Sequence, residues 1–165
     1  MKINIQNLKN GEYFFEFRSD STGLGLEEHE IFNYDIFIKS KVNKRDKNIV
    51  VSTQVGAKVD YLCDSCLTAF TDTIEEQFEV LFTTDRAFAD TDEDLVRLID
   101  ARTREIDLKT GVRDGLLLSI PMKVTCSENC KGLCSHCGAN LNETSCECKH
   151  ETIDPRWEKL RKLVS

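Results

Sequence analysis

Long apolar runs are absent from this sequence. No stretch of its 165 residues reaches the apolar length that a membrane-spanning helix needs. The first residues, MKINIQNLKNGEYF, lack the charged start and long apolar run of a secretory signal peptide. We therefore expect a cytoplasmic protein, in which thiols stay reduced and cysteines act as metal ligands or catalysts.

Signals of catalysis are also scarce. The sequence has three histidines and no glycine-rich phosphate loop, internal repeat or low-complexity tract. A zinc hydrolase or deaminase needs an open coordination position and an adjacent carboxylate base. The deaminase signature, in which x-Glu follows His or Cys and Pro-Cys-x2-Cys comes later, is missing. We expect a protein that is not an enzyme.

Positive charge is in the minority, since the formal net charge is −7. Eight cysteine thiolates would add more negative charge than two Zn²⁺ ions could offset. Such a charge disfavours broad nonspecific binding to nucleic acid. It favours a basic protein partner, or a small basic patch on an otherwise acidic body.

Cysteine, by contrast, is abundant, and its spacing is the most informative feature of the sequence. Six of the eight cysteines lie between Cys126 and Cys148, and Cys63 and Cys66 form a separate Cys-x2-Cys pair. Eight sulfurs supply two tetrahedral sites, which structural zinc prefers, so we predict two zinc ions per chain. Gly132 and Gly138 can take the positive φ angles that metal-binding turns need.

The ligands can be divided between the two sites in more than one way. One division leaves no Cys-x2-Cys pair split between metals, and we favour it. It places Cys134, Cys137, Cys146 and Cys148 in one site, and joins Cys126 and Cys130 to Cys63 and Cys66 in the other. The alternative is one site within Cys126–Cys137 and a second, shared site. An even cysteine count also permits a disulfide framework.

The pattern of the first half predicts an α+β fold with an N-terminal antiparallel β-sheet or small barrel. Alternating apolar residues predict strands, and these cover Glu12–Arg18, Glu30–Lys39, Val51–Tyr61 and Phe70–Phe82. The last two flank Cys63 and Cys66, which we therefore place at the tip of a long β-hairpin. The stretch KVNKRDKN predicts a basic turn, DTDED an exposed loop, and Leu95–Ile99 a short strand or helical turn.

One internal helix is predicted over residues 107–120, with Asp107 as its N-cap and Pro121 ending it. Leu108, Val112, Leu116 and Ile120 recur every four residues and form its core-facing stripe. These patterns divide the chain into a β-rich domain, 1–121, and a zinc-binding segment with a C-terminal helix, 122–165, packed on the first.

The C-terminal helix is predicted to begin at Asp154-Pro155, a cap followed by proline at the first helical position. Basic residues outnumber acidic ones from Lys149 to Ser165, and Trp157 lies among them. A basic helix on an acidic protein either pairs with its own body or contacts phosphate. The candidate contacts with RNA or another partner are Arg156, Lys159, Arg161 and Lys162.

Four stretches together resemble the YceD family, the large ribosomal RNA subunit accumulation proteins. They are CDSCLTAF, the segment from Ile106 to Pro121, the block CSENCKGLCSHCGANLN and the closing DPRWEKLRKL. The resemblance implies a non-enzymatic role in the accumulation of bacterial 23S ribosomal RNA, and hence in large-subunit assembly. Its implied partners are precursor 23S RNA, a basic large-subunit ribosomal protein, or both. The resemblance supplies no catalytic residues.

Two other functions remain open at this point. The first is a thiol redox protein that uses Cys63 and Cys66, although a redox Cys-x2-Cys normally opens a helix and this pair lies between strand patterns. The second is a zinc-ribbon module that binds nucleic acid in transcription. Such a ribbon would carry clustered basic and aromatic residues, but here it offers only Lys131 and Lys149.

Overall fold

The computed structural model describes residues 1–88 and 96–148 and has a mixed fold dominated by strands. Its main sheet has the order β2-β3-β4-β5-β6, antiparallel except for the parallel β5–β6 pair. The strands are β2 (Gly11–Ser19), β3 (Ile36–Arg45), β4 (Asn48–Leu62), β5 (Ala69–Thr83) and β6 (Val96–Leu98). Within the described residues the outer strands β2 and β6 do not pair, so the sheet is open and not a closed barrel.

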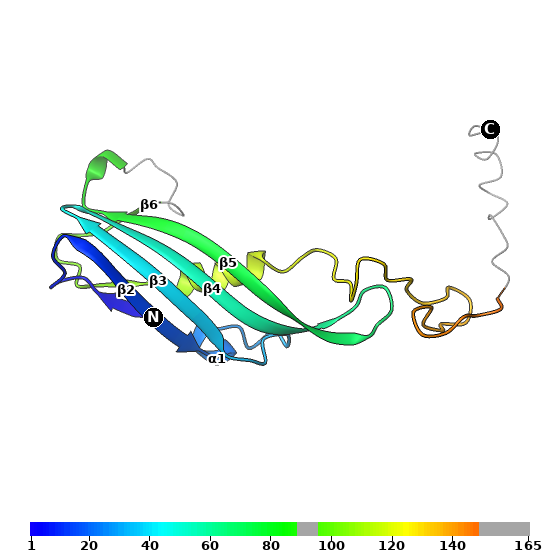
Figure 1. The fold of residues 1–165 in the computed structure, drawn as a ribbon. Helices are drawn as coiled ribbons and strands as arrows, with labels where there is room; N and C mark the ends of the chain where they lie inside the picture. The colour runs from blue at the N-terminus through cyan, green and yellow to red at the C-terminus, as the bar shows by residue number, and fades with distance from the viewer. Residues whose placement is uncertain (89–95, 149–165) are drawn as a thin grey trace, which may run out of the picture.

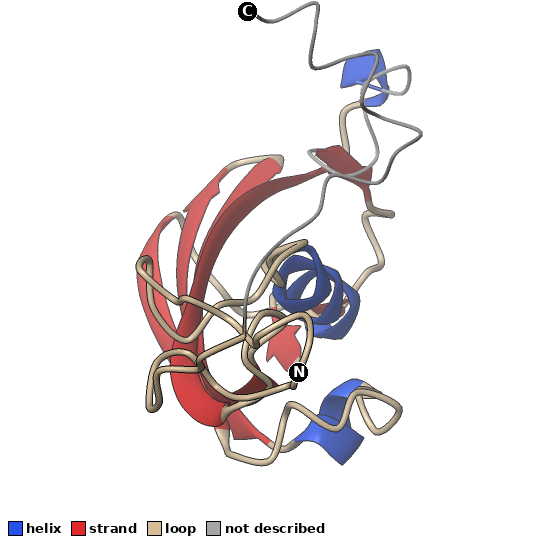
Figure 2. Cartoon of the chain, turned by 90° about the vertical axis from the view of Figure 1, so that its right-hand side faces the viewer, coloured by secondary structure: helices blue, strands red, loops and turns tan. Residues whose placement is uncertain are grey.

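Smaller elements complete the fold. A two-stranded antiparallel sheet joins β1 (Lys2–Asn4) to β7 (Glu105–Asp107). The helices are α1 (Ser21–Leu24), the 3-10 turn η1 (Arg86–Phe88) and α2 (Lys109–Leu118). Figure 2 shows α2 lying in the concavity of the curved main sheet.

The hairpin of β4 and β5 is the longest feature of the fold (Figure 1). Each strand has 15 residues, which corresponds to about 50 Å of extended chain. Buried and exposed residues alternate along β4 because one face packs on the core. Pairing ends at Leu62 with Ala69, so Cys63 and Cys66 lie in the turn at the tip. The predicted hairpin and the position of its cysteines are therefore confirmed.

The predicted strand Glu30–Lys39 is wrong over its first half, because β3 begins only at Ile36. The preceding residues form a loop that crosses to the far end of β4, where Asp60 N donates to Ile31 O at 3.0 Å. Phe32 in this loop is buried in the core. A loop that turns an apolar side chain inward thus produced the same alternation as a strand.

The predicted basic turn at KVNKRDKN is also mostly strand. β3 runs on to Arg45 and β4 starts at Asn48, so only Asp46 and Lys47 make the turn. Val42 within this stretch is fully buried, and Lys41 on the opposite face is exposed. Lys41 and Arg45 lie on the solvent face of the strand, whereas Lys44 follows Val42 on the other face and donates to Ile5 O at 3.3 Å, so the sequence showed only one apolar residue facing inward.

Helix α2 confirms the predicted internal helix, although its start differs. Val112 and Leu116 are fully buried against the sheet. Asp107 is not the N-cap; that position is Leu108, which makes no side-chain cap hydrogen bond. Asp107 instead ends β7, where its carboxylate accepts hydrogen bonds from Lys109 N at 2.9 Å and from the N-terminal amine at 3.1 Å. It therefore ties the start of the chain to the start of the helix.

Close contact between α2 and β5 depends on glycine. A Cβ on Gly111 would lie 3.0 Å from the ring of Phe78, and one on Gly115 would lie 3.2 Å from Glu76 Cγ. Because neither glycine has a side chain, the helix backbone can approach β5 directly at these two positions. Ser119 Oγ then donates to Glu76 at 2.9 Å, which fixes the end of the helix against β5.

Some predicted features fall on residues that the structure does not describe. These are the DTDED loop and the C-terminal helix with Trp157, Arg156, Lys159, Arg161 and Lys162. The stretch Leu95–Ile99 contains strand β6, so the strand interpretation was the correct one there. None of the helices in the described part of the chain is long and apolar enough to cross a membrane.

We predict that Leu116→Ala lowers the free energy of unfolding by about 2–5 kcal/mol, because it leaves a cavity between α2 and the sheet. Leu118→Ala is the matched control, since Leu118 lies on the same helix but is 85% exposed. It should change stability by less than about 0.5 kcal/mol. Chemical denaturation of both variants measures the difference, and equal losses would contradict the packing described here.

Candidate metal centres

The turn at the hairpin tip has the backbone geometry of a metal-binding knuckle. Cys63 N donates to Thr68 O at 3.0 Å, and Leu67 N donates to Cys63 O at 2.9 Å. Leu67 adopts a left-handed conformation with φ of 59°. This closure directs the thiols of Cys63 and Cys66 to the same side of the turn.

A second turn, Cys134–Ala139, repeats this arrangement almost bond for bond. Cys134 N donates to Ala139 O at 2.8 Å, and Gly138 N donates to Cys134 O at 2.9 Å. Gly138, which follows the second cysteine as Leu67 does in the first turn, has φ of 72°. The two Cys-x2-Cys sequences therefore form the same local structure, one with leucine and one with glycine at the strained position.

The segment after α2 wraps around the hairpin tip. Asp64 N donates to Val124 O at 2.8 Å, and Val124 N donates back to the Asp64 carboxylate at 2.6 Å. Further along, Leu133 N donates to Ser65 O at 2.9 Å. These bonds join residues about 60 positions apart in the chain, and they bring the cysteine-rich segment against the turn.

Gly132 permits the closest part of this contact. Its φ is +71°, and a Cβ there would lie 3.0 Å from Ser65 O. Any larger residue would be strained in its backbone and would also press on the hairpin turn. The predicted positive φ angles at Gly132 and Gly138 are both confirmed.

The eight sulfurs fall into two groups of four, and within each group the ligand atoms lie within 4.8 Å of one another. The groups are Cys63, Cys66, Cys126 and Cys130, and Cys134, Cys137, Cys146 and Cys148. This is the division that left no Cys-x2-Cys pair split. All eight thiols are free, so each group could hold one metal ion.

The first group joins two distant parts of the chain. Cys63 Sγ lies 3.8 Å from Cys130 Sγ, and Cys66 Sγ lies 3.6 Å from Cys126 Sγ. Both hairpin cysteines are buried. The second group comes entirely from residues 134–148, so it organises the segment that the first group attaches to the hairpin.

In each group, hydrogen bonds to the sulfur of one cysteine lower its pKa and favour its thiolate form. Burial by itself raises the pKa of Cys63, but backbone N–H groups of Cys126, Cys66 and Ser65 lower this pKa to about 6. In the second group, the N–H groups of Cys137 and His136 lower the pKa of Cys134 to about 6.

One thiol in each group resists ionisation beside these thiolates. The hydrogen bond with Cys66, followed by burial, raises the pKa of Cys126 to about 12. The hydrogen bond with Cys137, followed by burial, raises the pKa of Cys148 to about 12. A metal ion bound in either group would supply the positive charge that stabilises four neighbouring thiolates.

Sequence reasoning missed the polar residues that support the two groups. Asn142 accepts a hydrogen bond from Lys131 N at 2.9 Å and donates to Cys130 Sγ at 3.4 Å. Asn140 donates to Thr68 Oγ1 at 3.3 Å, and Thr68 Oγ1 lies 3.3 Å from Cys66 Sγ. The sequence feature that could have indicated these contacts is the pair of asparagines after Gly138, because asparagine side chains commonly form hydrogen bonds that close turns.

We predict that Gly132→Ala separates the cysteine-rich segment from the hairpin turn. The amide of Leu133, which donates to Ser65 O, should exchange its hydrogen at least about tenfold faster, since a loss of about 1.4 kcal/mol is one order of magnitude. Gly138→Ala is the control, because it imposes the same left-handed strain with no atom within 4 Å of the new Cβ. If NMR shows the same Leu133 exchange rate in both metal-loaded variants, the contact is not as described.

Comparison with known proteins confirms the resemblance to the YceD family. Residues 51–164 match the family model described as "Large ribosomal RNA subunit accumulation protein YceD". The matched region contains the hairpin, α2 and both cysteine groups. No solved structure matches the chain significantly.

Relatives come from bacteria and from plants. An uncharacterized protein of Mycobacterium tuberculosis is 28% identical over 144 residues, 86% of this chain and 66% of the relative. The Zea mays large ribosomal RNA subunit accumulation protein YCED homolog 1, chloroplastic, is 48% identical over 54 residues, 32% of this chain and 18% of the relative. The Arabidopsis thaliana protein of the same name is 40% identical over 60 residues, 36% and 19% of the two chains. The chain described here belongs to the YceD family of large ribosomal RNA subunit accumulation proteins.

Proposed function

We propose that this protein is a non-enzymatic, zinc-binding assembly factor of the large ribosomal subunit that acts in the cytoplasm. It would promote accumulation or processing of 23S ribosomal RNA by binding the RNA precursor, a basic ribosomal protein, or both. The observation that carries the proposal is the family match over residues 51–164. The name of that family refers to the accumulation of large-subunit ribosomal RNA.

The geometry of the cysteine groups supports zinc as the metal. A tetrahedral zinc site with Zn–S bonds of 2.3 Å places its sulfurs about 3.8 Å apart. Two pairs in the first group lie at 3.8 and 3.6 Å. Four sulfurs complete a tetrahedron and leave no position for a substrate, which is typical of structural zinc sites. We therefore assign all eight cysteines, Cys63, Cys66, Cys126, Cys130, Cys134, Cys137, Cys146 and Cys148, as zinc ligands.

The same grouping disfavours the thiol redox function. Cys63 and Cys66 lie in a β-hairpin turn, and each has a third sulfur within 4 Å from another part of the chain. A redox pair needs one accessible thiolate, but both of these cysteines are buried. A structural role fits their surroundings better.

Zinc content tests this assignment. We predict two zinc ions per chain in protein purified without added metal, measured by elemental analysis. Cys63→Ser and Cys130→Ser should each lower the content to one ion, because they remove ligands of the same site. Cys146→Ser should remove the other ion and leave the first. Near-zero zinc together with oxidised cysteines would contradict the assignment.

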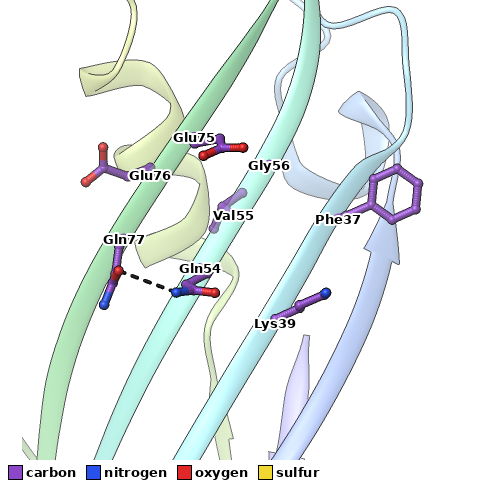
Figure 3. A pocket seen from close by; sticks show the side chains of 8 residues that line it. All are labelled: Phe37, Lys39, Gln54, Val55, Gly56, Glu75, Glu76 and Gln77. Carbon is purple, nitrogen blue, oxygen red and sulfur yellow. Dashed lines mark hydrogen bonds between the residues drawn. The ribbon is translucent and has the colours of Figure 1, made fainter.

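The outer face of the main sheet supplies a charged surface for partners. Its β3 side carries the exposed Lys39 and Lys41, and its β5 side carries the exposed Glu75 and Glu79. Figure 3 shows the hollow between the two sides, in which Lys39 lies across Gln54 from Gln77, and Glu75 lies one pair further along this face, across Gly56 from Phe37. Opposite charges on one face would let the sheet discriminate between basic and acidic ligands.

We assign the β5 side as the contact for a basic ribosomal protein. Glu75 and Glu79 lie four residues apart on one strand, so both side chains are on its outer face. The predicted C-terminal helix, with Arg156, Lys159, Arg161 and Lys162, remains the proposed RNA-facing element. In this proposal the sheet binds protein, and the C-terminal residues bind phosphate.

Crosslinking in cells tests the function directly. The tagged protein should recover precursor 23S RNA, a basic large-subunit protein, or both. The variant Glu75→Lys/Glu79→Lys should lower protein crosslinks at least about tenfold, since like-charge contacts cost several kcal/mol. Lys39→Gln/Lys41→Gln, on the other side of the same face, is the matched control and should retain those crosslinks. Recovery of neither large-subunit RNA nor large-subunit protein would contradict the proposed function.

A further inference from the structure

Strand β2 leaves one whole edge of the main sheet open. All nine of its residues pair with β3 in a continuous register, from Gly11 with Lys44 to Ser19 with Ile36. No strand in the described part of the chain pairs with its other side. Proteins commonly protect such edges with proline, lysine, bulges or very short strands. The sequence GEYFFEFRS has no proline or lysine and pairs without a bulge over nine residues, so its only protection is the charge of Glu12, Glu16 and Arg18.

The open edge also carries apolar side chains that are incompletely covered. Tyr13, Phe15 and Phe17 face the core but are only half-buried. The rings of Phe15 and Phe17 stack with centroids 6.4 Å apart. On the outer face Phe14 is 72% exposed. A strand added at this edge would cover rings on both faces.

The charges of β2 indicate that the added strand would be β2 of a second copy of this chain. Two copies of β2 related by a twofold axis pair antiparallel, and the residue on the axis sets the register. With Phe15 on the axis, Glu12 lies opposite Arg18 of the second copy. In the same register Tyr13 lies opposite Phe17, and Phe15 opposite itself, so the inner face forms an aromatic ladder.

Neighbouring registers are electrostatically worse. An axis through Phe14 places Glu12 opposite Glu16 of the second copy, and an axis through Glu16 places that carboxylate opposite itself. Like charges directly opposite each other in a sheet are destabilising. Only the Phe15 register pairs opposite charges and also uses the full length of the strand.

Ion pairs within each copy would extend across this interface. Lys41 Nζ lies 3.0 Å from Glu12, and Arg18 pairs with Asp35. In the Phe15 register these two pairs become one row of alternating charges, from Lys41 through Glu12 to Arg18 and Asp35 of the second copy. The cations also lie over aromatic rings, Arg18 over Phe37 and Lys41 over Phe14, which holds the row in place.

We propose that two copies of this chain associate through their β2 edges, antiparallel and centred on Phe15, into one continuous sheet. The inference requires neither the metal centres nor the ribosomal partner, and it would stand if either were wrong. Pairing through one strand buries a modest area, so the dimer should exchange with monomer at micromolar concentrations.

A charge exchange tests the proposal. Sedimentation velocity of the metal-loaded full chain, from about 1 to 100 μM, should show a mass that rises to twice that of the monomer. Glu12→Arg or Arg18→Glu alone should weaken dimerisation roughly tenfold or more, because each places like charges opposite each other twice. The double variant Glu12→Arg/Arg18→Glu should restore it, although both pairs within the chain are then lost.

Glu16→Arg serves as the register control, because Glu16 faces Phe14 of the second copy and its change should have a smaller effect. Thermal unfolding of every variant checks that the fold is retained. A wild-type chain that stays monomeric over the whole range would overturn the proposal, as would a double variant that is weaker than both single variants. If none of these substitutions changes dimerisation, another surface mediates it.

Discussion

The meeting of two distant chain segments at the hairpin tip is the constraint on which the functional end of this protein depends. The tip extends β4 and β5 beyond the helix that covers their inner face, and the segment that joins it carries few large apolar residues. Hydrophobic burial can contribute little there. Four sulfurs within 4.8 Å of one another, two from each segment, supply the attachment instead.

The negative charge of the thiolates would make this attachment depend on a bound cation. Each group contains one thiol whose pKa is lowered to about 6 and another whose pKa is raised to about 12, so a cation bound among the sulfurs would favour the all-thiolate form. Under the proposed zinc binding, metal uptake and the ordering of residues 122–148 would be coupled. The β-rich body differs, because it has a continuous core from Ile3 to Leu116 that needs no metal. Loss of metal should therefore disturb the tip and leave the sheet folded.

The sequence was most informative where one physical signal dominated. Strict alternation predicted the β4–β5 hairpin, and cysteine spacing predicted how the sulfurs would group. The sequence was misleading where a loop has the same pattern as a strand. Buried Phe32, which lies in a loop, extended the alternation of β3. The asparagines after Gly138 indicated a turn, but the sulfur partner of Asn142, Cys130, could not be predicted, because the contact depends on how separate segments meet. The open edge of β2 likewise follows only from strand order.

The central claim is that the eight cysteines form two closed four-sulfur centres, of which the first attaches the C-terminal segment to the hairpin and the second organises that segment. Proton-detected ¹¹³Cd NMR of the cadmium-substituted chain tests it most directly, because scalar coupling connects each metal to the β-protons of its own ligands. The account predicts two cadmium resonances, one coupled to Cys63, Cys66, Cys126 and Cys130 and the other to Cys134, Cys137, Cys146 and Cys148. A single resonance, or one coupled to both Cys63 and Cys146, would contradict it.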